Sequence, residues 1–307
     1  MAMELRHLRC FVAVAEEKHI TRAAERLGMQ QPPLSQLIKA LEREFDVQLF
    51  LRRPRGVELT EAGRVLLDNA RTLLAQYDRT FDSTRRAGRG EQGRICVGVM
   101  PTAPFHPFVP SAIRAFRAAF PLVSLTLDEC LRAEAINRLQ SDKMDVAFLR
   151  APIAGQHGLV DTQLLVEPMV VALPSEHPLA VPNDGDTAVS LKALARDTFI
   201  VYARQQGPAI YEATMAACLK AGFSPNLGQE APRVTSALSL VAAGLGVSVV
   251  PACMQRMAMD GVVYRTLKGA ALPTAVLTLA SRRGDPSPVV RHFLALVRRA
   301  MRQLPGG

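Results

Sequence analysis

The sequence lacks the cysteine and histidine patterns of a disulfide framework or a metal site. Five cysteines, an odd number, lie far apart at Cys10, Cys96, Cys130, Cys218 and Cys253. The six histidines are equally scattered, and the spacings CxxC, HxxH and HExxH are absent. This distribution suits reduced thiols in a cytosolic core and predicts no metal. A redox-sensing cysteine pair stays open as an alternative.

The sequence also lacks segments that direct a chain to or across a membrane. Residues 1–10 are charged and amphipathic, without an apolar core and a small-residue cleavage site, so we expect no secretory leader. The longest uncharged stretch, residues 237–254, contains Gly244, Gly246 and Pro251. These residues favour a buried helix, a glycine turn and a core strand over a membrane span. We therefore expect a cytoplasmic protein without a membrane partner.

Common catalytic motifs are missing as well. Gly244 and Gly246 lack the third glycine of a dinucleotide-binding fingerprint. Neither a GxSxG motif nor a phosphate-binding P-loop occurs. The sequence therefore predicts neither enzyme activity nor a cofactor.

The composition points to a multidomain globular protein with a polyanionic partner. Its 307 residues are too many for a single ordinary core and suggest about two or three domains. Hydrophobic residues make up 49% and charged residues 21%, so the chain has enough apolar surface to offset its conformational entropy. The net charge of +9 favours polyanions, because each Lys or Arg placed on a phosphate releases a counterion.

Residues 1–59 have the pattern of a winged helix-turn-helix. Apolar residues at three- and four-residue steps predict a first helix with these residues on one face: Leu5, Leu8, Val12 and Ala15. In a short second helix we expect Thr21 to cap the start and Gly28 to stop the end. The small Ala23 and Ala24 allow the close crossing of two helices.

A third helix follows, with a polar face suited to reading DNA. Pro32 and Pro33 fit its first turn, where a missing N–H costs nothing. One face is an apolar stripe: Leu34, Leu37, Ile38, Leu41 and Phe45. The opposite face is polar: Ser35, Gln36, Lys39 and Arg43. A recognition helix places such side chains in the major groove, whereas an ordinary amphipathic surface helix is the alternative.

A hairpin rich in arginine is predicted next. Residues 51–59 fit two short strands joined by a turn, with Arg52, Arg53 and Arg55 near the tip. Such a wing is able to contact phosphates or a minor groove. A solvated run of charges is the alternative.

Residues 60–91 predict a long connecting helix and a hinge. Thr60 is a suitable N-cap, and we expect the helix to run to about residue 87. An apolar stripe with a seven-residue repeat follows one face: Leu66, Leu67, Ala70, Leu73, Leu74, Tyr77 and Phe81. One helix alone cannot bury this seam, so we expect a homodimer through it, with packing on the chain's own residues as the alternative. The charged, glycine-broken residues 85–93 predict the hinge.

Residues 92–307 predict an α/β sensor domain. Short apolar, strand-like runs alternate with amphipathic helices, at 95–100, 124–129, 145–149, 169–173, 199–202, 247–250 and 275–279. We expect mostly parallel strands in two lobes. The first lobe is predicted at about 92–164 and 268–303, and the second at about 165–267, with a cleft between them.

Polar residues beyond the predicted strand ends are candidates for an effector site. Ligands of such sheets bind at the carboxyl ends of strands, where helix N-termini offer N–H groups to anions. The candidates are Thr102, Arg132, Arg150, Tyr202, Thr235 and Ser236. Their hydroxyls and positive charge suit a small carboxylate. For each of them a helix cap or a surface residue is the alternative.

The N-terminal segment resembles the signature of LysR-type transcriptional regulators nearly end to end: ELRHLRCFVAVAEEKHITRAAERLGMQQPPLSQLIKALEREFDVQLFLRRPRGVELTEAG. In that family the residues that meet DNA correspond here to Gln31, Pro32, Pro33, Ser35, Gln36 and Lys39, with Arg52, Arg53 and Arg55 from the wing. Arginine, which reads guanine, is usual at position 36, whereas glutamine pairs best with adenine. The resemblance therefore implies a half-site that differs from that of relatives at this position.

The C-terminal part resembles, more loosely, the type II periplasmic-binding-protein fold of LysR effector domains. The segments DVAFLRAP, PMVVALPSEHPLA and LSLVAAGLGVSVVPA are similar to regulators of aromatic-acid catabolism. In those relatives a hydroxyl residue matching Thr102 holds an effector carboxylate, and threonine or serine often stands at the position of Arg132. Pro104, His106 and Pro107 make the loop after Thr102 unlike that of most relatives.

The resemblance also implies partners. It implies a homotetramer of two dimers on double-stranded DNA, in which a small-molecule effector shifts the lobe angle and thereby the contact with RNA polymerase. Activation and repression both stay open. A solute-binding transport protein, the other alternative, shares the sensor fold but needs a leader and carries no DNA-reading head.

Overall fold

The chain folds into two compact units, Met1–Arg86 and Ala87–Gly307. The structure is a computed structural model that describes residues 3–153, 155–181, 188–204 and 207–303. Within these residues, no helix combines the length and the apolar character that crossing a membrane requires. Each unit is described by itself below.

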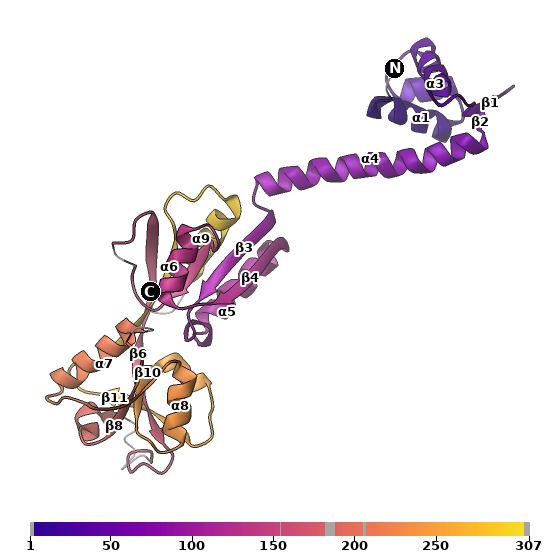
Figure 1. Cartoon of the computed structure of the whole chain (residues 1–307). Helices are drawn as coiled ribbons and strands as arrows, with labels where there is room; N and C mark the ends of the chain where they lie inside the picture. Colours follow the sequence, from indigo (N-terminus) through magenta and orange to yellow (C-terminus); the bar gives the residue numbers. More distant parts are fainter. Residues whose placement is uncertain (1–2, 154, 182–187, 205–206, 304–307) are drawn as a thin grey trace. The chain divides into compact units, whose positions relative to one another are not determined.

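The first unit begins with a cluster of short helices followed by a hairpin (Figure 1). Its elements are α1 (Leu5–Glu17), α2 (Ile20–Arg26), α3 (Gln31–Phe45), β1 (Phe50–Arg53) and β2 (Gly56–Leu59). Gly28 has a φ of 64°, as expected for the left-handed residue that stops α2. The predicted cap at Thr21 is wrong, because the N-cap of α2 is His19, two residues earlier, whose side chain accepts a hydrogen bond from the Thr21 N–H. The core includes Phe11, Val14, Leu34 and Leu41, all of them buried.

The hairpin is fixed to the helices through backbone contacts. Phe50 pairs with Leu59 and Arg53 with Gly56, so Pro54 and Arg55 form the turn. A Cβ added at Gly56 would lie 2.2 Å from the Lys18 carbonyl oxygen, and the φ of Gly56 is 147°. Only glycine fits this position, because backbone approaches closely there and the φ is in the region that favours glycine.

A long helix, α4 (Glu61–Gly88), follows the hairpin. The Thr60 Oγ accepts a hydrogen bond from the Gly63 N–H at 2.9 Å, which confirms the predicted cap. The 28 residues of α4 span about 42 Å. The start of the predicted hinge at residue 85 is wrong, since the helix continues to Gly88 and β3 begins at Gln92.

The second unit is an α/β domain with two lobes. Lobe I contains the sheet order β4-β3-β5-β12-β6: β4 (Leu122–Glu129), β3 (Gln92–Val99), β5 (Val146–Leu149), β12 (Thr274–Arg282) and β6 (Leu159–Pro174). Its helices are α5 (Phe108–Ala119), α6 (Arg132–Gln140) and α9 (Pro288–Met301). Buried Phe116, Phe148 and Phe293 lie at the centre of its core.

Lobe II is built on the second half of β6. Its strands are β7 (Ala188–Ser190), β8 (Thr198–Tyr202), β9 (Asn226–Ala231), β10 (Ser248–Pro251) and β11 (Val262–Lys268). Its helices are α7 (Pro208–Lys220) and α8 (Val234–Ala242). Short 3-10 turns complete the unit: η1 (Ala103–Phe105), η2 (Leu191–Leu194) and η3 (Ala252–Arg256).

The sheet is mixed rather than mostly parallel, which corrects the sequence prediction. β6 is antiparallel to β10, β11 and β12, whereas β3 is parallel to β4 and β5. The apolar run 169–173 is only the last part of β6, whose first ten residues, LVDTQLLVEP, pair with β12 and mix apolar with polar residues. The overall prediction of a winged helix-turn-helix, a long helix and a two-lobed α/β domain is confirmed.

Candidate functional site

The outward face of α3 carries most of the predicted DNA contacts. Gln31, Pro32, Pro33, Gln36 and Lys39 are exposed, and Ser35 is half-buried. Leu34, Ile38 and Leu41 on the opposite face are buried, which fixes the rotation of the helix. The predicted stripe ends earlier than expected, since Phe45 is exposed.

A groove lies along this face and the loop that follows α3. It has a volume of about 690 Å³, and its lining includes Gln36, Lys39, Glu42, Arg43 and Gln48. The Glu42 carboxylate accepts hydrogen bonds from the N–H groups of Leu49 and Phe50, at 2.9 and 3.2 Å. Glu42 therefore holds the start of the hairpin. The side chains of Gln36 and Lys39 are exposed, so their N–H donors are available to a ligand.

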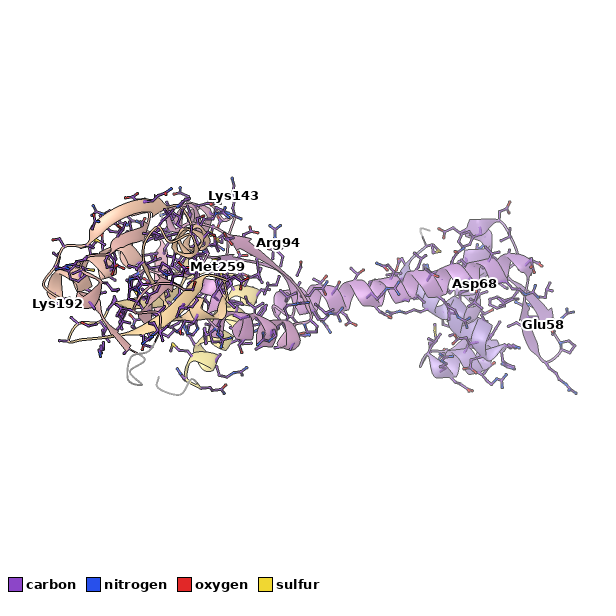
Figure 2. The ribbon with its side chains drawn as sticks, turned by 90° about the horizontal axis from the view of Figure 1, so that it is seen from below. Glu58, Asp68, Arg94, Lys143, Lys192 and Met259 are labelled. Carbon is purple, nitrogen blue, oxygen red and sulfur yellow. The ribbon has the colours of Figure 1, made fainter. Side chains whose placement is uncertain are left out.

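The hairpin presents its arginines to solvent. Figure 2 labels Glu58 on this hairpin and Asp68 on α4. The Arg53 Nε lies 3.0 Å from a Glu58 carboxylate oxygen, so one wing cation is already paired. Arg52 and Arg55 are exposed, and neither has an ion pair in the described part of the chain. These two are the wing residues with charge available for a phosphate.

The apolar seam of α4 is covered only near its start. Leu66, Leu67 and Leu74 pack against the helix-turn-helix core, whereas Tyr77 is 38% and Phe81 50% exposed. The Tyr77 and Phe81 rings lie 5.7 Å apart. Arg9 and Arg85 place guanidinium groups over the Tyr77 and Phe81 rings, at 5.6 and 5.0 Å from the ring centroids. Packing on the chain's own residues thus covers the first half of the seam and leaves the second half partly exposed.

Two predicted effector residues, Thr102 and Arg150, meet in a buried polar cluster. Arg150 is 2% exposed, and its Nε donates to the Thr102 Oγ at 3.0 Å. Its two other nitrogens donate to a Glu167 carboxylate oxygen, to the Thr102 carbonyl and to the Cys253 Sγ. A second Glu167 oxygen accepts the Cys253 N–H at 2.9 Å. Every guanidinium nitrogen of Arg150 is thus hydrogen-bonded within this cluster.

This cluster joins elements of both lobes. Thr102 and Arg150 follow β3 and β5 of lobe I, Glu167 is on β6, and Cys253 is on η3 of lobe II. Phe105 of η1 also packs against the lobe II core. The loop containing His106 is thereby held at the junction, where burial, with help from Arg150 and Arg256, lowers the His106 pKa against the opposing effect of Glu167.

A pocket of about 300 Å³ opens between the lobes. It is lined by Pro101, Glu129, Cys130, Leu131, Glu134, Pro232 and Arg233. Leu131 and Arg233 are the N-caps of α6 and α8, so the N-termini of two helices meet at this pocket. None of the six predicted effector residues is in the lining of this pocket, although Thr102 and Arg132 are each adjacent in sequence to a lining residue.

The remaining predicted residues lie around the same place. Thr235 and Ser236 are in the first turn of α8, half-buried, and neither hydroxyl caps the helix. Tyr202 ends β8 and is buried, and burial followed by the charge of Glu129 raises its pKa, which Arg233 opposes. Arg132 donates to the Pro152 carbonyl at 3.0 Å, while its Nε is buried without a hydrogen-bond partner in the described chain.

Sequence reasoning missed Glu167, Cys253, Glu129 and Arg233. Glu167 has a local signal, because a charged residue interrupts the strand-like run QLLVEPMVV. Glu129 has one as well, since it ends the predicted strand at 124–129. Cys253 on η3 and Arg233 before α8 reach the site only through the packing of the lobes.

Three of the five cysteines, Cys130, Cys218 and Cys253, do not have the environment of a redox sensor. Each is a free thiol in the part of the chain that the structure describes. Burial raises the pKa of Cys130 and Cys218 to about 11 and that of Cys253 to about 12. Since the thiolate is the reactive form, these thiols are poor nucleophiles near neutral pH.

Comparison with known proteins places both parts of the chain. Residues 5–64 match the model "Bacterial regulatory helix-turn-helix protein, lysR family", and residues 88–302 match "LysR substrate binding domain". The chain is 36% identical over 294 residues to the HTH-type transcriptional regulator BudR of Raoultella terrigena, covering 96% of this chain and 100% of that protein. It is 36% identical over 298 residues to the HTH-type transcriptional regulator CatR of Pseudomonas putida, covering 96% and 98%.

A solved structure agrees with these matches. Full-length CbnR in complex with its target DNA has a TM-score of 0.85 to this chain at 26% identity, covering 97% of this chain and 100% of CbnR. The matched families and relatives are transcriptional regulators, not enzymes. The chain therefore belongs to the LysR family of transcriptional regulators, with a DNA-binding helix-turn-helix domain followed by a LysR substrate binding domain.

Proposed function

We propose that this regulator binds a small carboxylate in the pocket between its lobes and responds with a changed lobe angle. The observation that carries this proposal is the meeting of the α6 and α8 N-termini at the pocket, where Leu131 and Arg233 form part of the lining. The first turns of both helices have backbone N–H groups outside the intrahelical ladder, and such groups bind anions. Arg233 adds a cation from lobe II.

Thr102 has a supporting role in this proposal. Its hydroxyl oxygen accepts from Arg150, which leaves the hydroxyl hydrogen free to be donated to a carboxylate oxygen. Aromatic acids are the first candidates, because the sensor segments resemble regulators of aromatic-acid catabolism. The ligand can shift the lobe equilibrium only by its differential affinity for the two arrangements.

A thermal-shift panel of aromatic and dicarboxylic acids tests the effector proposal. At a hundred times its dissociation constant, a true effector stabilises the protein by about 2.7 kcal/mol. We expect Arg233→Gln and Thr102→Ala to reduce that stabilisation. An acid that stabilises the wild type and both variants equally would place its site elsewhere.

For DNA, we propose that the exposed residues Gln31, Pro32, Pro33, Gln36 and Lys39 of α3, together with half-buried Ser35, meet the major groove. Arg52 and Arg55 then contact the backbone beside it, with the paired Arg53 as a weaker contributor. Gln36→Arg is expected to change base preference from adenine toward guanine at one half-site position. Footprinting on an operator series tests this, and an unchanged preference contradicts it.

For assembly, we propose a homodimer through the exposed half of the α4 seam and a homotetramer of two such dimers that contacts RNA polymerase. Leu73 is 49% exposed on this seam, and Leu73→Glu is expected to convert the dimer into monomers in sedimentation experiments. In vitro transcription with purified polymerase, with and without effector, then separates activation from repression. An unchanged sedimentation coefficient would contradict the α4 interface.

A further inference from the structure

The pocket between the lobes contains an unpaired charge of each sign. Glu129, the last residue of β4, belongs to lobe I, and Arg233, the N-cap of α8, belongs to lobe II. Both line the pocket. Within the described chain, neither Glu129 nor Arg233 forms an ion pair, either with the other or with a third residue. Two opposite charges thus face one cavity without neutralising each other.

Glu134, the second acid in the pocket lining, differs from Glu129 because it has an ion-pair partner. A Glu134 carboxylate oxygen lies 3.4 Å from an Arg138 nitrogen. Arg138 also pairs with Asp128, so its one positive charge is shared between two carboxylates. The charge of Glu129 is also felt by Tyr202, whose pKa is raised by burial and then by this carboxylate. Glu129 is therefore the acid with charge available to a ligand.

A ligand with more than one negative charge and no positive charge fits this lining poorly. Its carboxylate finds Arg233 and the N–H groups of α8, but any second negative charge meets Glu129 across a small space. With Glu129, Glu134 and Arg233, the lining side chains carry a formal charge of −1. A like charge placed close by is unfavourable, whereas a cation beside Glu129 is favourable.

We infer that the effector carries both a carboxylate and a protonated amine, as an amino acid does. The carboxylate binds Arg233 and the N-terminus of α8, and the ammonium group binds Glu129. One small molecule then joins lobe I to lobe II through its two charges, which gives it the differential affinity for one lobe angle that a switch requires. The volume of about 300 Å³ limits the ligand to a small one. This inference rests on the proposed carboxylate site and narrows its ligand class.

Matched ligand pairs test the inference on the full-length protein. The proteinogenic L-amino acids are screened by thermal shift, and each active one is compared by calorimetry with the acid that lacks its amino group. Examples are phenylalanine with 3-phenylpropanoate and glutamate with glutarate. We expect at least one amino acid to bind about tenfold or more tightly than its partner. Glu129→Gln is expected to abolish that preference by weakening the amino acid alone.

A control variant and a folding check accompany the test. Glu176→Gln replaces an exposed glutamate that lies outside the pocket, and it is expected to keep wild-type affinities. Circular dichroism and DNA mobility shift verify that each variant is folded. If acids without the amino group bind equally or better and Arg233→Gln weakens them, the carboxylate site stands and the zwitterion inference is overturned. If no amino acid binds, or Glu129→Gln leaves amino-acid affinity unchanged, the inference is also overturned.

Discussion

Removing Glu167 should destabilise Ala87–Gly307 far more than removing an exposed glutamate. Arg150 and Glu167 are 2% and 6% exposed, and Glu167 is the one anionic partner of the Arg150 guanidinium among the described residues. Glu167→Leu leaves a buried, unpaired cation, which costs about 3–5 kcal/mol. The same substitution removes the acceptor of the Cys253 N–H. A buried N–H left without an acceptor lowers the free energy of unfolding by about 1–3 kcal/mol.

Urea unfolding and calorimetry measure this loss. For a domain of this size, each kcal/mol lowers Tm by about 2–4 °C, so a fall of roughly 10 °C or more is expected. The double variant Arg150→Met/Glu167→Leu, which removes both charges, should recover most of the loss. Glu212→Gln serves as the control, because Glu212 and Arg204 form an exposed pair at 3.7 Å, and such pairs contribute little. A Glu167→Leu variant within 1.4 kcal/mol of the wild type, a tenfold change in the folding equilibrium, would refute this reasoning.

Three further predictions follow from individual residues. Gly56→Ala should abolish operator binding in a mobility-shift assay while circular dichroism stays near that of the wild type, because the new Cβ collides with the Lys18 carbonyl and displaces the wing; undiminished binding would show that the wing tolerates the shift. His106 has a folded-state pKa below its usual 6.5, so the unfolded chain binds the proton more readily, and stability is full above pH 6.5 and falls as the pH drops from there toward the lower folded value. Urea midpoints of the wild type should therefore fall more than those of His106→Gln between pH about 7.5 and about 5.5, and parallel curves would contradict the shift. Cys130, Cys218 and Cys253 should resist alkylation at pH about 8 in the native protein and react after unfolding, since burial raises each thiol pKa to about 11 or 12; rapid native labelling of Cys253 would reopen a redox role.

The first unit was predictable because its signals are local. Pro32 and Pro33 lie in the first turn of α3, Thr60 caps the start of α4, and Gly28 ends α2. Each of these residues lies within a few positions of the helix end that it determines. The misplaced cap at Thr21 is a local error of the same kind, because a histidine took the position usually given to Ser, Thr, Asp or Asn.

The second unit was predictable in outline but not in detail. β9 has the sequence NLGQEA, and five of its six residues are exposed, so no apolar run marked it. The three residues of β7 are too few for a pattern. The direction of β6 relative to β12 depends on pairing between segments about a hundred residues apart, which periodicity does not encode.

The candidate site shows the same limit. Thr102 and Arg150 were identified as single residues at strand ends, yet their contact spans 48 positions in sequence. Glu167 and Cys253 lie 86 positions apart, and it is their hydrogen bond that closes the cluster. The ends of strands can be predicted from local sequence patterns. The hydrogen-bond or ion-pair partner of a charged residue cannot, because it depends on how the strands are arranged in the sheet.

The position of β12 has a consequence for how the chain is made. β12 lies between β5 and β6 in the sheet, although it is the last of the described strands along the chain, at Thr274–Arg282. Until it arrives, the nascent chain exposes the open hydrogen-bonding edges of β5 and of the first half of β6. Lobe II can assemble during synthesis, while lobe I waits until β12 has been made. Chains that end before Thr274 should consequently be degraded or aggregate, which pulse proteolysis of such truncations would reveal.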